Sequence, residues 1–194
     1  MRPLQTLIAP ALLATLALSA CASQPKPVAA SANGVSTSVK WFGANSVETS
    51  LRADKSATTF AAAAQEAGVA GALSGPGPVT VFAPTNAALA KAVDPSLMKS
   101  ENRDQLAQLV NCHIMSSELT PATLSSMIKQ NGGSYPVITT GGCVLTATQV
   151  HDVVTLTDQN GVSATLTHGR SHRGNGMIYK VDKVFSPKGN VASN

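Results

Sequence analysis

The sequence of 194 residues is poor in aromatic residues and in charge, and both shortages limit what the protein can do. Only four Phe, two Tyr and one Trp are present, so the core must rest on aliphatic residues, with Phe60 and Phe82 as its expected anchors. Charged residues make up 12% of the chain and the formal net charge is +4, which is too small an excess to indicate nucleic acid binding. We therefore expect few stacking platforms for a ligand and no nucleic-acid partner.

The sequence also lacks the short motifs that mark common enzyme classes. It contains no HExxH zinc motif, no Walker or Rossmann glycine-rich loop, no GxSxG nucleophile elbow and no kinase signature. Asp152 and Asp158 fall at the turns of predicted hairpins, which does not indicate a paired catalytic acid and base. We therefore predict that the protein is not an enzyme, has no catalytic residue and requires no cofactor or metal.

The most apolar segment lies at the N-terminus and predicts export. A single cation, Arg2, precedes an apolar run over 7–18, which ends in the small residues Ser19 and Ala20. The run is shorter than the roughly 18–20 residues that a membrane-spanning helix needs, and its end suits a signal peptidase. We therefore interpret residues 1–20 as a signal peptide that is absent from the mature protein.

The four residues at the predicted cleavage site, Leu18 to Cys21, resemble the lipobox of bacterial lipoproteins. The resemblance implies that Cys21 is acylated and becomes the new N-terminus, and several acyl chains anchor a protein stably to a membrane. Ala22 is not the aspartate associated with inner-membrane retention, so the expected location is the outer membrane, facing the periplasm or the cell surface. The alternative is an ordinary secretory signal followed by a coincidental cysteine.

The rest of the chain divides into a linker, one domain and a short tail. Residues 21–40 hold the predicted lipid and a flexible linker rich in Ala, Ser and Pro with almost no charge. Residues 41–188 have the length of one domain with its own core, and residues 189–194 form a C-terminal tail.

Periodicity predicts helices in the first half of this domain. Four helices are expected: one capped by Ser56 or Thr58 and stopped by Gly68, one with Pro84 in its first turn, one carrying Leu106, Leu109, Val110 and His113 on one face, and one opened by Thr120-Pro121. Strands dominate the second half, over 135–139, 143–149, 153–157, 162–167 and 177–184, in addition to a buried strand over 79–82. The turn over 158–161 favours a hairpin. Helices followed by strands indicate the α+β class.

Three segments, in the right order, resemble the fasciclin (FAS1) family. Residues 80–89 read TVFAPTNAAL, residues 109–114 read LVNCHI, and residues 175–184 read NGMIYKVDKV. The resemblance implies a single FAS1-like domain, a wedge-shaped β-sandwich with N-terminal and flanking helices. It also implies a non-enzymatic adhesion or interaction role with protein or glycan partners. The residues of these segments that we expect to be structural are Thr80, Phe82, Pro84, Thr85, Asn86, His113, Asn175, Gly176 and Asp182.

Physical chemistry supports a structural interpretation of the three segments. Thr85 and Asn86 can satisfy the free N–H groups of the helix that follows Pro84, and Gly176 permits a positive φ in a tight turn. The sequence departs from the family at two positions: Cys112 replaces a frequent tyrosine and Tyr179 a frequent histidine. A receptor-binding role of the tyrosine–histidine pair in some animal members is therefore not carried over, and His113 keeps only a structural role.

Cys112 and Cys143 remain after acylation of Cys21, and an exported protein meets an oxidising compartment. We expect a disulfide between them, with two buried free thiols as the alternative. A catalytic Cys112–His113 pair is not expected, because neighbouring side chains diverge on both helices and strands. We expect His113 to be a core histidine that is hydrogen-bonded to the backbone.

The segment 168–174 is the most distinctive expected loop. It carries His168, Arg170, His172 and Arg173 among glycine and serine. Three interpretations stay open: a solvated basic connection, a site for an anion or acidic glycan, and a metal site in which His168 and His172 are ligands, with or without His151. The second and third define an alternative function, a periplasmic lipoprotein that binds a small ligand, anion or metal.

Overall fold

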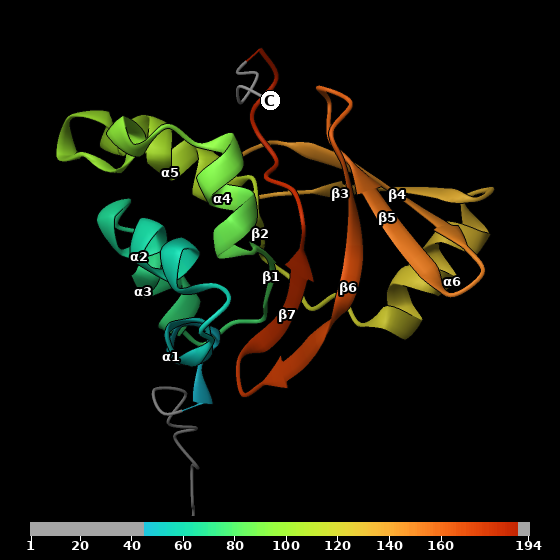
Figure 1. The fold of residues 1–194 in the computed structure, drawn as a ribbon. Helices are drawn as coiled ribbons and strands as arrows, with labels where there is room; N and C mark the ends of the chain where they lie inside the picture. Colours follow the sequence, from blue (N-terminus) through green and yellow to red (C-terminus); the bar gives the residue numbers. More distant parts are fainter. Residues whose placement is uncertain (1–44, 190–194) are drawn as a thin grey trace, which may run out of the picture. The chain divides into compact units, whose positions relative to one another are not determined.

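A computed structural model describes residues 45–189, which belong to a compact unit spanning Val39–Asn194 (Figure 1). The predicted signal peptide, Cys21 and almost all of the predicted tail lie outside the described residues, so these interpretations stay predictions. Within the described residues, no helix is long and apolar enough to cross a membrane.

Helices occupy most of the first half of the domain, as expected. They are α1 (Val47–Ala53), α2 (Thr58–Glu66), α3 (Ala70–Ser74), α4 (Asn86–Ala92), α5 (Arg103–Asn111) and α6 (Pro121–Gln130), with 3-10 turns η2 (Pro95–Met98) and η3 (Ser100–Asn102) before α5. The first five helices gather on one side of the sheet, whereas α6 lies at the far end beside β3 and β4 (Figure 1).

Seven strands form one sheet. They are β1 (Val79–Pro84), β2 (Ile114–Met115), β3 (Ser134–Ile138), β4 (Val144–Val150), β5 (Val153–Thr157), β6 (Ser163–Arg173) and β7 (Gly176–Val181), in the spatial order β2-β1-β7-β6-β5-β4-β3. Only the pair β1–β7 is parallel, and the others are antiparallel. The predicted hairpin over 158–161 is confirmed, with Leu156 opposite Ala164. The α+β class is confirmed.

Two apolar clusters hold the domain together. The first lies between the five N-terminal helices and one face of β1 and β7, and Phe60 is completely buried in it. The second contains Phe82, residues of α6 and inward-facing residues of β3, β4, β5 and β7, so both halves of the sheet share one core. The sheet therefore curls over its own inner face as a sandwich does. Both predicted anchors are confirmed, and Phe82 stacks on Tyr179 with ring centroids 5.8 Å apart.

Several boundaries differ from the predictions. Pro84 ends strand β1 and does not lie in a helix; Thr85 is the N-cap and α4 begins at Asn86. His113 lies beyond the end of α5, where Cys112 is the C-cap. The prediction of a loop over 168–174 is wrong, because β6 continues to Arg173. The strand pairs with β7 on both sides of an irregularity between Thr167 and Ser171.

Candidate functional site

Polar residues of the TVFAPTNAAL segment form hydrogen bonds with parts of the chain that are distant in the sequence. The Thr80 hydroxyl is fully buried, donates to the Ser117 carbonyl (2.7 Å) and accepts from the Leu119 N–H (2.9 Å). Thr85 caps its own helix by accepting from the Ala88 N–H (3.2 Å), as expected. These side chains have their hydrogen bonds inside the fold and present no reactive group to solvent.

Asn86 caps a different helix from the one we predicted. Its Oδ1 accepts from the Thr59 N–H (2.9 Å), and its Nδ2 donates to the Lys55 carbonyl (2.9 Å) and to the Thr58 hydroxyl (3.1 Å). Neither Ser56 nor Thr58 caps α2, because the cap position is Ala57, which makes no side-chain hydrogen bond. The start of α2 is therefore satisfied by a side chain from a later part of the sequence.

Asn175 joins the N-terminal helices to the turn between β6 and β7. It is buried, its Oδ1 accepts from the Val47 N–H (2.8 Å), and its Nδ2 donates to the carbonyls of Leu73 and Gly75 (2.8 Å each). The next residue, Gly176, does not have a positive φ; glycine is needed because a Cβ there would collide with the Val79 carbonyl. The predicted reason for this glycine was wrong, although its structural role holds.

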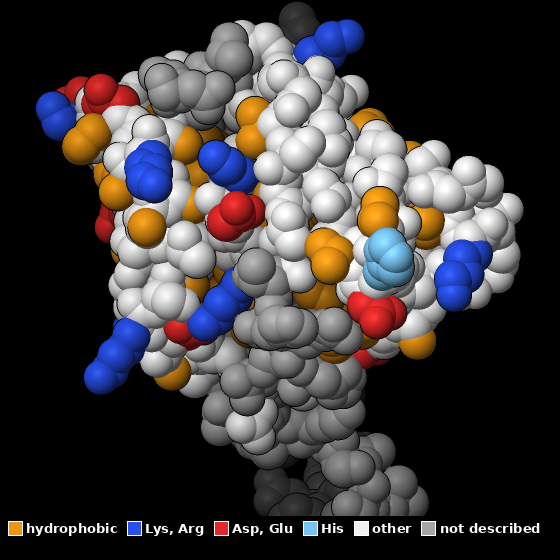
Figure 2. All heavy atoms as spheres, turned by 45° about the vertical axis from the view of Figure 1, so that its right-hand side comes forward, with side chains coloured by type: hydrophobic (Ala, Val, Ile, Leu, Met, Phe, Trp, Pro, Cys, Tyr) orange, Lys and Arg blue, Asp and Glu red, His pale blue; other side chains and the backbone are white. Residues whose placement is uncertain are grey.

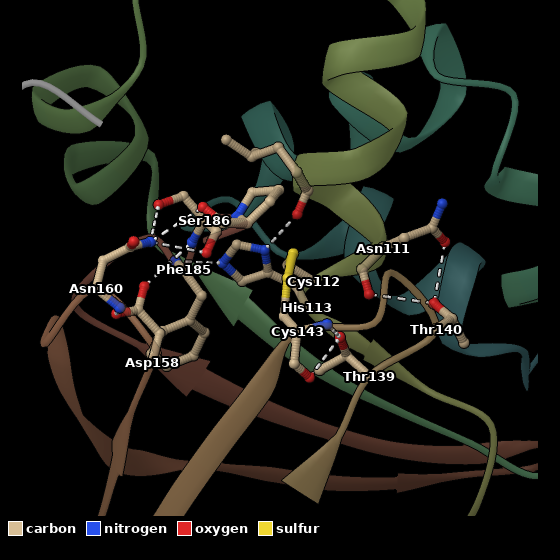
Figure 3. The surroundings of a disulfide bond; sticks show 12 residues. Asn111, Cys112, His113, Thr139, Thr140, Cys143, Asp158, Asn160, Phe185 and Ser186 are labelled. Carbon is tan, nitrogen blue, oxygen red and sulfur yellow. Dashed lines mark hydrogen bonds between the residues drawn. A yellow bond between two sulfur atoms is a disulfide. The ribbon is translucent and has the colours of Figure 1, made fainter. Parts of the chain in front are cut away.

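His113 is a core histidine, as predicted (Figure 3). The Phe185 N–H donates to Nε2 (3.0 Å), so Nδ1 carries the proton and donates to the Leu109 carbonyl (2.9 Å). Burial lowers the pKa of His113 from 6.5 to about 4, although the bond to Leu109 and the Asp158 carboxylate both favour the protonated form. The imidazole is therefore neutral at pH 7 and holds two backbone segments together, with no access to a substrate.

The expected disulfide between Cys112 and Cys143 is present (Figure 3). The two Cα atoms lie 5.2 Å apart across a sequence separation of 31 residues, and both side chains are buried. The turn before β4 is also fastened to the end of α5 by hydrogen bonds from the Thr140 hydroxyl to Asn111 and from the Gly141 N–H to the Asn111 carbonyl. The bond is inaccessible to a substrate and has a structural role.

A concave site lies between the start of α6 and the β4–β5 hairpin. Its volume is about 310 Å³, at the lower end of the range for ligand cavities. Two of its lining residues, Val154 and Leu166, also pack against the second apolar cluster. The residues that line it are Pro121, Leu124, Ser125, Gln149, Asp152, Val154, Leu166 and Tyr179, and we call it the hairpin hollow. Sequence reasoning missed it, because its walls come from α6 and four strands that only the fold brings together.

A second groove, of about 610 Å³, lies between α4 and residues 182–184. Lys91, Lys183 and Asp182 give it mixed charge, and α4 and the turn after β5 supply small or aliphatic residues. The Asp182 carboxylate accepts from the Thr165 N–H (3.3 Å). The groove contains no concentration of charge of either sign.

Among the described side chains, the outer face of the strands β3 to β6 carries no charge. The side chains of β6 are described as far as Leu166. Up to that point, the residues that face outward are Ser134, Pro136, Ile138, Val144, Thr146, Thr148, Val150, Val153, Thr155, Thr157, Ser163 and Thr165. Ile138, Val150 and Val153 are the large hydrophobic side chains that the described part of the chain exposes, at 63%, 67% and 51%. Figure 2 shows hydrophobic side chains among uncharged surface on this side, with a histidine and an acidic side chain directly beside them.

The structure does not test the predicted roles of segment 168–174 in binding an anion or a metal. The backbone of His168, Arg170, His172 and Arg173 belongs to β6, but their side chains lie outside the described part of the structure. His151, the third residue of the metal hypothesis, lies at the tip of the β4–β5 hairpin with φ 54°. Among the described residues, no three His, Cys, Asp or Glu side chains lie together as metal ligands would. Anion binding by this segment stays a prediction.

Comparisons with known proteins agree with the three sequence segments. The family model described as the Fasciclin domain matches residues 55–187. Protein sll1483 of Synechocystis sp. is 32% identical over 133 residues, which cover 67% of each chain. A FAS1 domain pair from the insect cell adhesion molecule fasciclin I aligns with 71% of this chain and 43% of its own, at 19% identity and a TM-score of 0.46. On the family model and the Synechocystis relative, the chain belongs to the fasciclin domain family.

Proposed function

We propose that the protein is a non-enzymatic interaction module of the bacterial cell envelope, anchored through a lipid on Cys21 and binding a protein or glycan partner through its fasciclin domain. Membership of this family supports an interaction role. The lipobox-like residues 18–21 and the linker-like composition of 21–40 support the anchor. The lipid would then hold the domain at the membrane surface, and the length of the linker would set how far from the membrane the domain can bind a partner.

One observation carries the proposal. The exposed large hydrophobic side chains of the described residues lie on one sheet face, on which no described side chain is charged: Val150 and Val153 lie opposite each other at the hairpin end, and Ile138 lies at the other end. The centres of protein interfaces are depleted of charged residues, and this face is uncharged over its described side chains. The polar residues of the family segments, in contrast, are occupied inside the fold, so we place partner contact on the sheet face.

A binding experiment with matched variants tests the proposal. The protein, kept in a non-ionic detergent, is used in two assays. It is immobilised on beads to retain partners from an envelope extract, and in solution it is applied to a glycan array. A variant with Val150→Lys and Val153→Lys should lose the specifically retained partner, whereas Ala62→Lys with Gln65→Lys, which adds the same charge to the exposed face of α2, should retain it. Equal loss in both variants would show that added charge, and not the sheet face, was responsible.

The anchor has its own test. Cells that produce the full chain should incorporate radiolabelled palmitate into the protein, and Cys21→Ser should abolish the label while Cys143→Ala preserves it. Unchanged labelling of Cys21→Ser would contradict the lipoprotein assignment.

A further inference from the structure

The hairpin hollow combines an acidic group with aliphatic walls. Asp152 is exposed and is the charged residue of the lining, which contains no Lys, Arg or His among the side chains that the structure describes. Its carboxylate offers two acceptor oxygens and no donor. An anionic ligand would therefore be repelled, and a cationic one attracted, although the chain as a whole has a formal net charge of +4.

Gln149 adds an acceptor whose hydrogen bonding is incomplete. Its Nε2 donates to the His151 carbonyl (2.8 Å), which fixes the orientation of the amide. Its Oε1 is shielded from solvent and has no hydrogen-bond partner within the part of the chain that the structure describes. A buried acceptor without a donor costs about 1–3 kcal/mol. A donor that enters the hollow completes this hydrogen bonding after a small movement of the amide.

The remaining lining residues define the shape of the ligand. Pro121, Leu124, Val154 and Leu166 form aliphatic walls. Tyr179 is 2% exposed and its hydroxyl donates to the Leu119 carbonyl (2.6 Å), so it presents no open ring face for stacking. A flexible aliphatic chain suits such walls better than a planar ring does.

We propose that the hairpin hollow binds an aliphatic ammonium or guanidinium group, carried by a lysine or arginine side chain of a partner or by a small free amine. This inference rests on the proposed interaction role, for which it names one contact. Lysine and arginine carry only donors, matching the acceptors Asp152 and Gln149, and their methylene stems pack on apolar walls. A volume of about 310 Å³ accommodates one such group.

The test uses the full chain, labelled with ¹⁵N and kept in a non-ionic detergent. Each probe is titrated into the protein, and NMR monitors the backbone resonances. The two cationic probes are 1,5-diaminopentane and the blocked tripeptide acetyl-Gly-Lys-Gly-amide; the matched probes are glutarate and the norleucine tripeptide. Both cations should shift the resonances of the hollow residues, with affinity at least threefold lower in 200 mM than in 20 mM salt. Tighter binding of the tripeptide assigns the site to a protein side chain, and tighter binding of the diamine assigns it to a free amine. Equal shifts with glutarate or norleucine would overturn the proposal.

Two variants separate binding from folding. Asp152→Asn should weaken cation binding at least fivefold, whereas Asp104→Asn, which removes an exposed carboxylate from α5, should leave it unchanged. Gln149→Leu should weaken binding and leave the melting temperature unchanged, because the loss of the exposed hydrogen bond from Nε2 to the His151 carbonyl is offset by the removal of a buried oxygen without a partner. A lower melting temperature with unchanged affinity would instead assign Gln149 a structural role and refute its part in the site.

Failure of this inference can be told from failure of the proposed function. If the envelope partner is retained equally by the native protein and Asp152→Asn, the interaction role stands and the hollow is not its contact. If no partner is retained while the diamine still binds in an Asp152-dependent manner, the hollow stands as a small-amine site and the interaction role falls.

Discussion

The buried neutral imidazole of His113 makes the stability of the domain sensitive to mild acid. Burial lowers its pKa from 6.5 to about 4 in the folded protein, whereas the unfolded chain has the ordinary value. Below pH 6.5 the unfolded chain therefore binds a proton that the folded chain does not bind until the pH approaches 4. The stability that this group contributes is present above 6.5 and is lost as the pH falls toward 4. At about 1.4 kcal/mol per pKa unit, acidification from pH 7 to pH 5 should remove about 2 kcal/mol.

Urea denaturation followed by far-UV circular dichroism measures this loss as the unfolding free energy at each pH. His113→Gln should be less stable at pH 7, because it loses buried hydrogen bonds, but should show a much weaker pH dependence between 7 and 5. His151→Asn, which removes an exposed histidine and tolerates its positive φ, should keep the native slope. The carboxyls with lowered pKa, Asp54 and Asp94, titrate below 3.8 and fall outside this window. The reasoning is refuted if the native protein is equally stable at pH 7 and 5, or if His113→Gln retains the full slope.

Three further predictions concern the framework of the domain and use the same denaturation assay at pH 7. Replacing Cys112 and Cys143 together by alanine should lower the unfolding free energy by about 3.5–4 kcal/mol, because a loop of 31 residues is released in the unfolded chain; a loss under about 1 kcal/mol would contradict this. Gly176→Ala should lower the unfolding free energy by more than about 3 kcal/mol, because the new methyl group would push strand β1 away from strand β7. Gly71→Ala, on the open side of α3, should raise the unfolding free energy by about 0.5–1 kcal/mol, and the steric argument is refuted if the two substitutions have similar effects. Asn175→Ala should cost about 3 kcal/mol through the loss of three buried hydrogen bonds, and a neutral result would argue against its role as a junction.

Features that depend on neighbouring residues could be predicted from the sequence. Thr120-Pro121 opens α6 with the expected cap, since Thr120 accepts from the Thr123 N–H (3.1 Å). The hairpin over 158–161 follows from turn chemistry, with Gly161 at φ 85°. In these cases the groups that satisfy the backbone lie within four residues of each other, so pattern and spacing carry the information.

Apart from the disulfide, features that depend on distant partners were predicted wrongly or missed. Asn86 was assigned to the helix that it begins, but its amide reaches α2, about 27 positions earlier. Segment 168–174 looks like a loop because glycine and charged residues interrupt its apolar alternation, yet pairing with β7 makes most of it a strand. The hairpin hollow has no sequence signal, because none of its lining residues is unusual in its local setting.

The sequence by itself determined the class of the domain, its family, the identity of the disulfide cysteines and the structural character of His113, because these follow from residue types, periodicity and motifs of fixed spacing. Tertiary structure alone decided which side chains satisfy which backbone groups, why Gly176 must lack a side chain, and where acceptors and aliphatic walls meet in a hollow. Such properties arise where the parallel pair β1–β7 and the curled sheet bring together segments about 100 residues apart. Local pattern cannot encode that proximity, because it depends on how the whole core is buried.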